Sequence, residues 1–461
     1  MTHPDWYAAL DARALKEAYP MGEAFVARYT AMSRDELRHR QERDFALLMR
    51  KAWTVPFYRR RWQAAGIEPG DIRSLDDLPK LPAFDKADLM ASIARHPPLG
   101  DFHGLPPEAR APVVLHTTSG TTGRPQPLLF GPWGREVANV LVARMAIWQG
   151  LEPSDVVHSV YGHGMINGGH YIREAYTRWT GCLFLSAGTG VETRSARQVE
   201  LMRDFGVTVL VGFVDYIRKL AKVARDAGLE PGRDIPLRMI IGHLGAEDRA
   251  ATEAAWGGAR AYDWYGVGDT GAIAGEGPDR DGLYVWEDAH VLEIADVATG
   301  RPLPEGEPGD MIVTCLYKRD VAPIVRFNTH DVSAFRTDAN STGMVFRRIR
   351  GFLGRSDNMV KLKGINVFPH AIAAYLEGRP ELTGEYVCRL TRDPDGADRL
   401  TVVIEHQAPG DAAARAALAR LLRERLGVEV GVELVPPGAT APLTEIEVRQ
   451  KPLRLRDERR P

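Results

Sequence analysis

The sequence predicts an α/β protein with a large N-terminal domain built on parallel strands, a β-rich portion, and a small α+β domain at its C-terminal end. Three observations support this fold class. Strand-length apolar runs alternate with helical patterns from about residue 111 to 250, short alternating strands with Gly and Pro turns follow from about 282 to 350, and the pattern changes again after Gly354. Alternating strands and helices are typical of βαβ units and therefore of a mainly parallel sheet.

The N-terminal region, about residues 1–105, has helical patterning. Ser33-Arg-Asp-Glu36 is a capping-box sequence, in which the Ser and Glu side chains satisfy free N–H groups at a helix start. We expect this helix to run to about Trp53, with breaks near Pro79, Pro82 and Pro97-Pro98.

The middle region supplies the expected βαβ units. The strand candidates are Val156-Val157, Leu183–Leu185, Val207–Val211 and Met239–Ile241, and the helix candidates are Glu192–Arg203 and Tyr216–Ala227. Their alternation implies parallel strands joined by crossover helices.

The C-terminal region contains an amphipathic helix at 413–426, with Gly427 placed to cap its end. Its apolar side is formed by Leu418, Leu421, Leu422 and Leu426. Strand candidates 400–404 and 428–434 flank the helix, which indicates a separate small domain. The expected domain limits are 1–355 and 356–461.

The composition is that of an ordinary globular protein, with 44% hydrophobic and 26% charged residues in a length that corresponds to about two or three domains. A formal net charge of −2 argues against nucleic acid or an anionic membrane as the main partner. No apolar run reaches the ~18 residues of a membrane-spanning helix. The three cysteines form no C-x-x-C pair and the N-terminus lacks a secretory signal, so we expect a cytoplasmic protein without disulfides or zinc.

The most distinctive segment is His116-Thr-Thr-Ser-Gly-Thr-Thr-Gly-Arg-Pro125, which lies between the apolar runs 113–115 and 128–130. This arrangement predicts a strand–loop–strand turn. Glycines let backbone N–H groups converge on an anion and hydroxyls add donors, so the loop suits a polyphosphate. No Gly-Lys-Ser/Thr follows, which excludes a Walker A loop. The same composition is also typical of a solvated turn, and the loop alone does not separate the two.

Further segments rich in glycine, aromatic and charged residues follow along the chain. They are Tyr161-Gly-His-Gly-Met-Ile-Asn-Gly-Gly169, Gly245-Ala-Glu247, Asp263-Trp-Tyr-Gly266, Arg326-Phe-Asn-Thr-His-Asp331, the stretch Gly354–Pro369, and Leu443–Asp457. In this order they resemble the motifs of the adenylate-forming superfamily of acyl- and aryl-CoA synthetases, luciferases and peptide-synthetase adenylation domains, most closely its phenylacetate–CoA ligase branch. The resemblance extends from Val55 to Asp457 and implies two domains, ATP use and acyl-adenylate chemistry.

The resemblance assigns several segments to the nucleotide. The residues implied for ATP or AMP are Thr118, Ser119, Gly120, Thr121, Thr122, Gly123, Gly245, Ala246, Glu247, Asp263, Trp264, Tyr265, Gly266, Asp331 and Arg355. In this set the loop 118–123 grips the leaving pyrophosphate and Tyr265 stacks on adenine. The Asp331 carboxylate has the lone pairs to accept both ribose hydroxyls, and Arg355 lies near the ribose.

Three positions depart from the family's pattern. Gln126 stands where the superfamily has a lysine, although uncharged residues also occur there in this branch, and Arg124 is a candidate for supplying the positive charge. Gly268 and Asp269 stand where Ser or Thr and then Glu are expected. Asp is shorter than Glu but is still a hard oxygen ligand, so Asp269 is the implied Mg²⁺ ligand. Thr270 is a candidate for supplying the missing hydroxyl.

The acid pocket is implied to lie around 161–169. Its candidate lining residues are Tyr161, His163, Gly164, Met165, Asn167 and Phe213. Glycines allow a flat substrate to approach the backbone. The polar character of the segment leads to the hypothesis of a hydroxylated, aminated or heterocyclic aryl acid. Taken alone, the segment is also typical of a glycine-rich turn with a structural histidine, and Phe213 fits a core position equally well.

The remaining implied residues serve the conformational change and the chemistry. Asp357 corresponds to the hinge, and Lys363 and Gly364 shape the approach of the thiol. Lys451 corresponds to the catalytic lysine, which bridges the carboxylate and the α-phosphate and stabilises charge that develops in the transition state. This register is anchored on Arg454-Leu-Arg-Asp457; anchoring on Thr444-Glu445 would place Glu447 there, and a frayed basic tail is the alternative.

The implied reaction is ATP-dependent activation of an aromatic carboxylic acid to an acyl-adenylate. Transfer to coenzyme A then gives an aryl-CoA thioester, AMP and pyrophosphate, with ATP, Mg²⁺ and coenzyme A as cofactors and substrates. A carrier-protein thiol or an amine stays open as the acceptor, and a non-catalytic nucleotide-binding relative is a third interpretation. Dimers are common in this branch, so the resemblance allows a homodimer.

Overall fold

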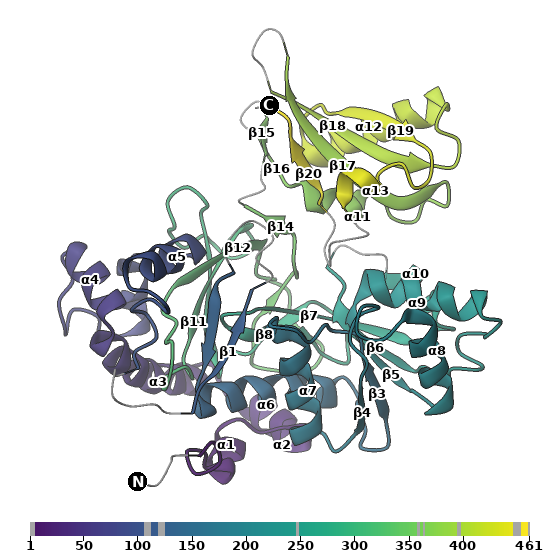
Figure 1. Ribbon diagram of the computed structural model, residues 1–461. Coiled ribbons are helices and arrows are strands. Elements are labelled where there is room, and N and C mark those ends of the chain that lie inside the picture. Colours follow the sequence, from purple (N-terminus) through teal and green to yellow (C-terminus); the bar gives the residue numbers. More distant parts are fainter. Residues whose placement is uncertain are drawn as a thin grey trace. The chain divides into compact units, whose positions relative to one another are not determined.

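The computed structural model describes residues 5–105, 112–118, 125–245, 249–356, 360–362, 365–393, 398–445 and 453–459. The chain forms two compact units. One comprises Met1–His243 and Ala250–Gly351, and the other comprises Leu244–Arg249 and Phe352–Pro461. The predicted fold class, a large α/β part followed by a small α+β part, is confirmed (Figure 1).

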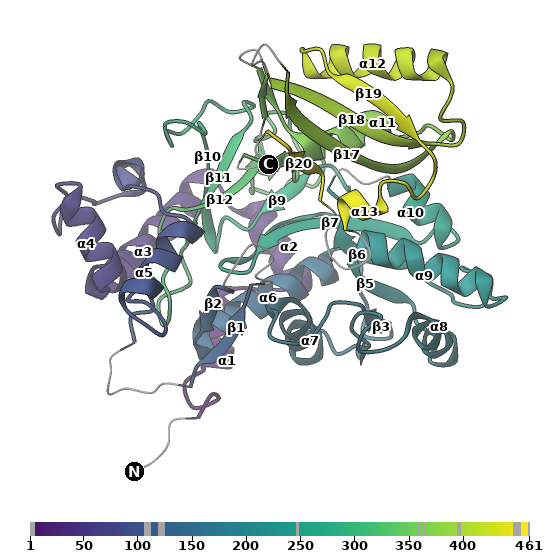
Figure 2. The same ribbon diagram turned by 45° about the horizontal axis from the view of Figure 1, so that its top comes forward.

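The first unit begins with helices. They are α1 (Ala12–Ala18), α2 (Gly22–Ala31), α3 (Arg34–Thr54), α4 (Pro56–Ala64), the 3-10 helix η1 (Leu75–Lys80) and α5 (Lys86–Arg95). The capping box predicted for α3 is present, because the Glu36 N–H donates to the Ser33 hydroxyl and the Ser33 N–H donates to the Glu36 carboxylate. Helices α3, α4 and α5 lie together in both views (Figures 1 and 2).

The main sheet of the first unit has the strand order β13-β9-β8-β7-β6-β5-β3-β4. Its strands are β3 (Val156–Ser159), β4 (Leu183–Ser186), β5 (Val209–Phe213), β6 (Met239–His243), β7 (Arg260–Val267), β8 (Gly271–Glu276), β9 (Leu283–Val285) and β13 (Arg348–Ile349). Neighbours from β4 to β7 are parallel, and neighbours from β7 to β13 are antiparallel. The predicted parallel strands are therefore present and continue into an antiparallel half.

Helices connect and cover these strands. They are α6 (Pro132–Trp148), α7 (Asn167–Trp179), α8 (Ser195–Asp204), α9 (Val214–Asp226) and α10 (Arg249–Ala255). Parallel crossovers are right-handed, and the chain moves outward from β3 to β4 and then back to β5. Helix α7 therefore covers one face of the sheet, and α8 and α9 cover the other. The carboxyl ends of β3, β5 and β6 meet at one edge, where sheets of this kind bind ligands.

A second, antiparallel sheet contains β10 (His290–Ala295), β11 (Gly309–Cys315) and β12 (Phe327–Ser333), and a hairpin joins β1 (Val114–Thr117) to β2 (Pro127–Phe130). Strand β12 has a bulge, since its register against β11 shifts between Asp310 and Ile312. His330 in this bulge has a left-handed φ of 57°. Bulges re-aim side chains, and this one carries Asp331.

The second unit contains a sheet in the order β19-β18-β17-β20. The helices and strands of the whole second unit are β14 (Gly354–Arg355), β15 (Val360–Leu362), β16 (Ile365–Val367), η2 (Pro369–Ala371), α11 (Ile372–Leu376), β17 (Leu382–Arg392), β18 (Asp398–His406), α12 (Ala412–Leu426), β19 (Gly431–Val435), α13 (Ala441–Thr444) and β20 (Leu455–Asp457). Helix α12 ends at Gly427 in the left-handed conformation, as predicted. Leu418 and Leu422 pack with Tyr386 and Val402 into a core that belongs to this unit.

None of the helices in the described ranges combines the length and the apolar character needed to cross a membrane. All three cysteines are free; Cys315 and Cys388 are buried, and Cys182 is half-buried.

Candidate active site

The frame of the expected phosphate loop is the β1–β2 hairpin. The strands pair from Val114 opposite Phe130 to Thr117 opposite Pro127. Beyond them, the Thr118 N–H donates to the Gln126 carbonyl at 3.0 Å, and the Gln126 N–H donates to Thr118 Oγ1 at 3.1 Å. The predicted strand pairing is therefore present, and two hydrogen bonds close the base of the loop.

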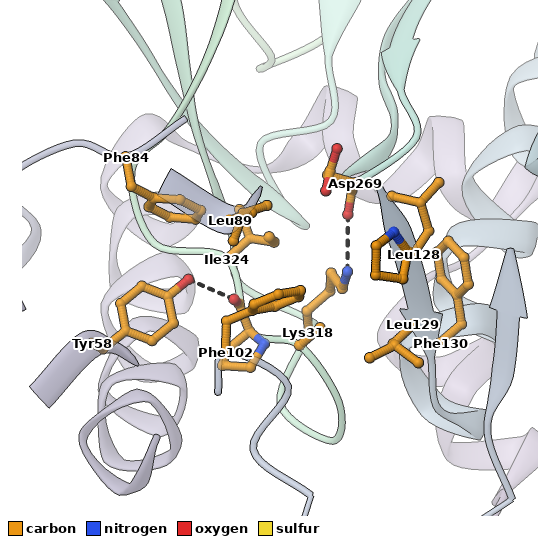
Figure 3. A pocket seen from close by; sticks show the side chains of 13 residues that line it. Tyr58, Phe84, Leu89, Phe102, Leu128, Leu129, Phe130, Asp269, Lys318 and Ile324 are labelled. Carbon is orange, nitrogen blue, oxygen red and sulfur yellow. Dashed lines mark hydrogen bonds between the residues drawn. The ribbon is translucent and has the colours of Figure 1, made fainter. Parts of the chain in front are cut away.

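Asp269, the implied Mg²⁺ ligand, lies in the turn between β7 and β8, next to a small pocket of the first unit. Gln126 donates Nε2 to its Oδ1 at 2.6 Å. Lys318 donates Nζ to the Asp269 backbone carbonyl at 2.9 Å (Figure 3). Burial raises the pKa of Asp269, against the opposing effects of Lys318 and Gln126. Burial lowers the pKa of the Lys318 ammonium, which also lies 5.4 Å from the centre of the Phe130 ring.

The residues around Asp269 fit a Mg²⁺ site to which the protein contributes a single carboxylate. Within the described ranges, no group of three or more His, Cys, Asp or Glu side chains is arranged to hold a metal ion. Mg²⁺ is commonly held by one or two carboxylates, with waters and substrate phosphates completing its octahedron. A single carboxylate at the base of a phosphate loop is therefore compatible with Mg²⁺ carried by ATP, and not with an all-protein metal cage.

The packing next to Asp269 bears on Gly268, one of the three positions that depart from the family's pattern. A Cβ at Gly268 would lie 2.9 Å from Leu128 Cδ1, so a side chain there would require the Leu128 side chain of β2 to shift. Thr270 is fully buried, and its hydroxyl donates to the Gly271 carbonyl at 3.3 Å. The Thr270 hydroxyl thus already has a partner within the chain, and its role as a replacement for the missing hydroxyl stays a prediction.

The two segments assigned to adenine and ribose meet directly. The Tyr265 hydroxyl donates to Asp331 Oδ2 at 2.8 Å, across a separation of 66 residues, and both side chains are buried. Strand β7 places Tyr265, and the bulge in β12 places Asp331. At Gly266 a Cβ would lie 2.4 Å from the Gly271 carbonyl oxygen, so only glycine fits this point of the β7–β8 ladder.

The adjacent residues of β7 are held by backbone contacts. The Trp264 N–H donates to Asp263 Oδ1 at 2.8 Å, and the Asp263 N–H donates to Glu276 Oε2 at 2.8 Å. The Asp263 carboxylate therefore helps to hold the backbone of β7 at Trp264.

The pocket residues predicted around Tyr161 and Phe213 form one aromatic group. The two rings meet edge to face at 5.1 Å between centroids. His243, at the end of β6, stacks on Phe213 at 5.3 Å and lies 4.2 Å from the Trp264 ring, and its Nδ1 is 2.9 Å from the Trp264 carbonyl. These side chains come from the carboxyl ends of neighbouring strands, which places an apolar aromatic wall at the ligand-binding edge of the sheet.

The polar part of the predicted pocket is more constrained. The His163 N–H donates to Glu192 Oε1 at 2.9 Å, and His170 Nε2 donates to the His163 and Gly164 carbonyls at 2.9 Å. Burial, and then His170, lower the pKa of His163, so its imidazole is neutral at pH 7. His163 Nε2 is buried and has no hydrogen-bond partner among the described residues.

Gly164, Met165 and Asn167 occupy different environments. Gly164 is exposed and Met165 is 54% exposed. Asn167, in contrast, is buried at the start of α7, where its Oδ1 accepts from Arg135 at 2.6 Å. The side chain of Asn167 is therefore committed to Arg135 rather than to an open pocket.

Other predicted site residues lie in the second unit or outside the described ranges. Gly245 has a positive φ of 54°, and Arg355 lies in β14; both belong to the second unit. The predicted residues outside the described ranges are Ser119, Gly120, Thr121, Thr122, Gly123, Ala246, Glu247, Asp357, Lys363, Gly364 and Lys451.

Sequence reasoning missed His243 and Lys318. His243 lies two residues beyond the predicted strand Met239–Ile241 and ends the observed strand β6, and the rule that ligands bind at the carboxyl ends of parallel strands could have identified it. Lys318 carries no such signal, because only the fold brings it to Asp269 across 49 residues.

Comparison with known proteins identifies the class first. A family model described as AMP-binding enzyme matches residues 59–315, and a model described as AMP-binding enzyme C-terminal domain matches residues 364–459. The crystal structure of 2-hydroxyisobutyryl-CoA ligase in the postadenylation state, in complex with R3-HIB-AMP, has a TM-score of 0.79 and 26% identity, and the match covers 99% of this chain and 95% of that one.

Curated relatives then specify the branch. The phenylacetate-coenzyme A ligase of Thermus thermophilus is 31% identical over 447 residues, covering 90% of this chain and 95% of that protein. The phenylacetate-coenzyme A ligase of Pseudomonas putida is 33% identical over 392 residues, covering 81% of this chain and 83% of that protein. The chain belongs to the adenylate-forming AMP-binding enzyme family, in its phenylacetate–CoA ligase-like branch, as the motifs predicted.

Proposed function

We propose that this protein is an AMP-forming acid–CoA ligase that activates an aromatic carboxylic acid. ATP and the acid give an acyl-adenylate and pyrophosphate, and coenzyme A then takes the acyl group and releases AMP. The observation that carries the proposal is the 2.8 Å hydrogen bond from Tyr265 to Asp331, which joins the segments assigned to adenine and ribose. Membership of the phenylacetate–CoA ligase-like branch supports the choice of acid and acceptor.

In the first step, a carboxylate oxygen of the acid attacks the α-phosphorus of ATP, and the bond to pyrophosphate breaks. Asp331, fixed through Oδ2 by Tyr265, accepts from the ribose and holds the α-phosphorus at a defined distance from the acid. Asp269 would hold Mg²⁺, which neutralises phosphate charge when it is bound. We assign Lys451 to the charge that develops between the carboxylate and the α-phosphate.

In the second step, the thiolate sulfur of coenzyme A attacks the acyl carbonyl carbon, and the bond to the AMP oxygen breaks. The hinge role of Asp357 and the thiol-guiding roles of Lys363 and Gly364 are part of the proposal. So are the phosphate contacts of Ser119–Gly123, the adenine contacts of Ala246 and Glu247, and the ribose contact of Arg355. The domain limits 1–355 and 356–461, a cytoplasmic location and a homodimer are likewise proposals.

The pocket supports an aryl acid that carries a polar substituent. Tyr161 and Phe213, together with His243, offer aromatic faces for a flat ring. Neutral His163 has a buried Nε2 without a hydrogen-bond partner among the described residues, and a hydroxyl, amino or ring nitrogen of the substrate would satisfy it. Unsubstituted phenylacetate would leave this nitrogen unsatisfied.

ATP–pyrophosphate exchange across a panel of aryl, arylacetic and aliphatic acids tests the function. We expect exchange with a polar aryl acid, and a loss on the order of 100-fold or more in Lys451→Ala. Tyr265→Phe should raise the KM for ATP roughly tenfold, since a buried hydrogen bond is lost. Tyr176→Phe is the matched control, because its buried hydroxyl has no hydrogen-bond partner among the described residues.

Three results would contradict parts of this proposal. If no acid of the panel supports ATP–pyrophosphate exchange, the proposed adenylation activity is wrong. Exchange that survives Lys451→Ala would move the catalytic role to another residue. A preference for unsubstituted phenylacetate over every polar analogue would exclude the polar substituent.

A further inference from the structure

Residues that depart from the family's pattern meet in the structure. Gln126 is 1% exposed, and its Nε2 donates to Asp269 Oδ1 at 2.6 Å, across 143 residues of chain. The amide can adopt only this orientation, because the flipped form would place Oε1 against a carboxylate oxygen. Gln126 Oε1 is buried and has no hydrogen-bond partner within the described ranges, so the contact to Asp269 is what fixes the side chain.

Lys318 holds the backbone of Asp269, whose carboxylate contacts Gln126. Its ammonium donates to the Asp269 backbone carbonyl at 2.9 Å rather than to the carboxylate, and it lies over the Phe130 ring (Figure 3). Lys318 is only 4% exposed, so its position is set by the surrounding core. The backbone of Asp269 is therefore held in place, and its carboxylate accepts from the Gln126 amide and from its own backbone N–H, so that Gln126 supplies the side-chain contact that orients it.

Strand β2 connects these contacts. Gln126 immediately precedes β2, and Leu128 within it closes the space at Gly268. A larger residue at 268 would require the end of the Leu128 side chain to shift. Gln126 and Asp269 are therefore joined directly by a hydrogen bond, and Gly268 beside Asp269 packs against the same strand.

We propose that Gln126 is a positioning residue for Asp269, and that its neutral amide orients the carboxylate toward one divalent cation without neutralising it. This inference rests on the metal role that the proposed function gives to Asp269. A lysine at 126 would place an ammonium at contact distance from the carboxylate, and the resulting ion pair would compete with the cation. Substitutions at 126 and 269 therefore have coupled effects on metal affinity.

The test measures metal binding instead of turnover. Binding of Mn²⁺ to the full-length protein with α,β-methylene-ATP is followed by electron paramagnetic resonance, and calorimetry records binding of the analogue without metal. We expect Asp269→Asn and Gln126→Lys each to weaken Mn²⁺ binding about 10- to 100-fold, and Gln126→Met about tenfold, as for residues that orient metal ligands. Metal-free binding of the analogue should not weaken in any of these variants, since no nucleotide contact is removed. It should stay within about twofold of the native value in Gln126→Met and become tighter in Asp269→Asn and Gln126→Lys, which each add one unit of positive charge beside the polyphosphate.

A double-substitution cycle tests the coupling. In the Asp269→Asn background, Gln126→Lys should weaken Mn²⁺ binding less than about threefold, because no carboxylate remains for the ammonium to neutralise. Gln149→Met is the matched control, since Gln149 is also buried but donates to the Glu276 carbonyl; it should bind Mn²⁺ like the native protein.

The outcomes separate this inference from the proposed function. Native Mn²⁺ affinity in both Gln126 variants, with a loss in Asp269→Asn, would overturn the positioning role alone. An equal effect of Gln126→Lys in both backgrounds would also overturn it. Native affinity in Asp269→Asn would overturn the metal role of Asp269 together with this inference. If Gln126→Lys does not fold, the test uses Gln126→Met and the double-substitution cycle that combines Gln126→Met with Asp269→Asn.

Discussion

At the scale of single residues, His330 links charge to the placement of Asp331. Its Nε2 lies 2.9 Å from Asp85 Oδ2 and its Nδ1 lies 3.6 Å from Asp310 Oδ2. The hydrogen bond to Asp310, opposed by burial and reinforced by Asp85, raises the pKa of His330 to about 9. The imidazolium therefore pins the bulge of β12, where His330 has a φ that favours glycine.

This geometry predicts a pH dependence. The folded-state pKa lies above the ordinary 6.5, so the proton stabilises the ordered bulge at neutral pH, and this contribution is lost as the pH rises through about 9. After allowance for solvent screening, the contribution is on the order of 1 kcal/mol. We expect the KM for ATP to rise several-fold, by about the same free energy, between pH 8 and 10, with less change in kcat.

Two variants isolate the cause of the pH effect. His330→Gly accepts the left-handed φ without strain and does not titrate, so its KM for ATP should lose this pH dependence. His330→Ala keeps the strain without the ion pairs and should bind ATP more weakly than His330→Gly at pH 7.5. An unchanged pH profile in His330→Gly would show that another group is responsible.

The residue scale also shows where sequence reasoning ends. Gly427 could be predicted, because a left-handed cap at the end of an amphipathic helix follows from the local pattern. Lys318 and His330 could not be predicted, because their roles depend on carboxylates and carbonyls that only the tertiary fold brings near them. Asn167 shows the reverse case, since a polar residue in the right segment turns out to serve a buried arginine.

At the scale of elements, polar contacts decide where helices and strands begin. Helix α8 begins at Ser195 rather than at the predicted Glu192, because Glu192 accepts from the Thr189 and His163 N–H groups and so ties a loop to the pocket segment. Apolar periodicity predicted β3, β4, β5 and β6 and the helices α8 and α9 in the right order, but it did not predict α6, α7 or β17. It could not predict these boundaries, because side-chain hydrogen bonds from distant residues set them.

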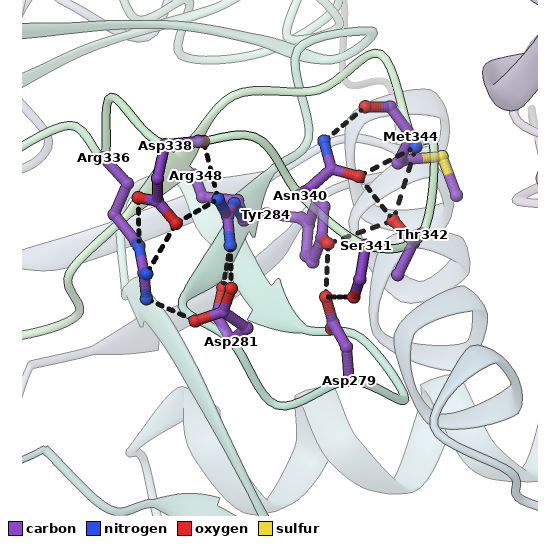
Figure 4. A network of polar contacts seen from close by, with 10 residues as sticks. All are labelled: Asp279, Asp281, Tyr284, Arg336, Asp338, Asn340, Ser341, Thr342, Met344 and Arg348. Atoms are coloured by element: carbon purple, nitrogen blue, oxygen red, sulfur yellow. Dashed lines mark hydrogen bonds and ion pairs between the residues drawn. The ribbon is translucent and has the colours of Figure 1, made fainter.

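A polar network secures the end of the main sheet where β13 pairs with β9 (Figure 4). Arg348 is 3% exposed; it pairs with the Asp281 carboxylate and donates to the Asp338 carbonyl at 2.8 Å. Arg336 bridges the same two aspartates. The Asp281 and Asp338 side chains are 40% and 51% exposed, so their charges stay solvated without Arg348. Arg348→Met mainly removes the hydrogen bonds from the buried guanidinium to the Asp281 and Asp338 carbonyls, and should cost about 1–2 kcal/mol of unfolding free energy.

Chemical denaturation of Arg348→Met measures this loss, and Arg350→Met is the matched control because Arg350 is exposed. The KM for ATP should stay at the native value in both variants, since the network lies outside the residues assigned to ATP. A loss below about 0.5 kcal/mol would mean that the network acts as an exposed surface cluster.

At the scale of the whole molecule, each compact unit has a core of its own. Leu422 of α12 is fully buried among the residues of the second unit, and Ile217 of α9 is fully buried in the first unit. Units with separate cores unfold as separate cooperative transitions unless a large interface couples them. We therefore expect differential scanning calorimetry to resolve two transitions, of which the larger enthalpy belongs to the longer unit.

Two core truncations assign these transitions. Leu422→Ala and Ile217→Ala should each lower the stability of their own unit by about 2–5 kcal/mol, which corresponds to a shift of several degrees in one transition and little change in the other. ATP should raise the transition that responds to Ile217→Ala, because Tyr265 and Asp331 lie in that unit. If either truncation moved both transitions equally, the two units would unfold as one, and the small unit could not respond to ligands independently of the large one.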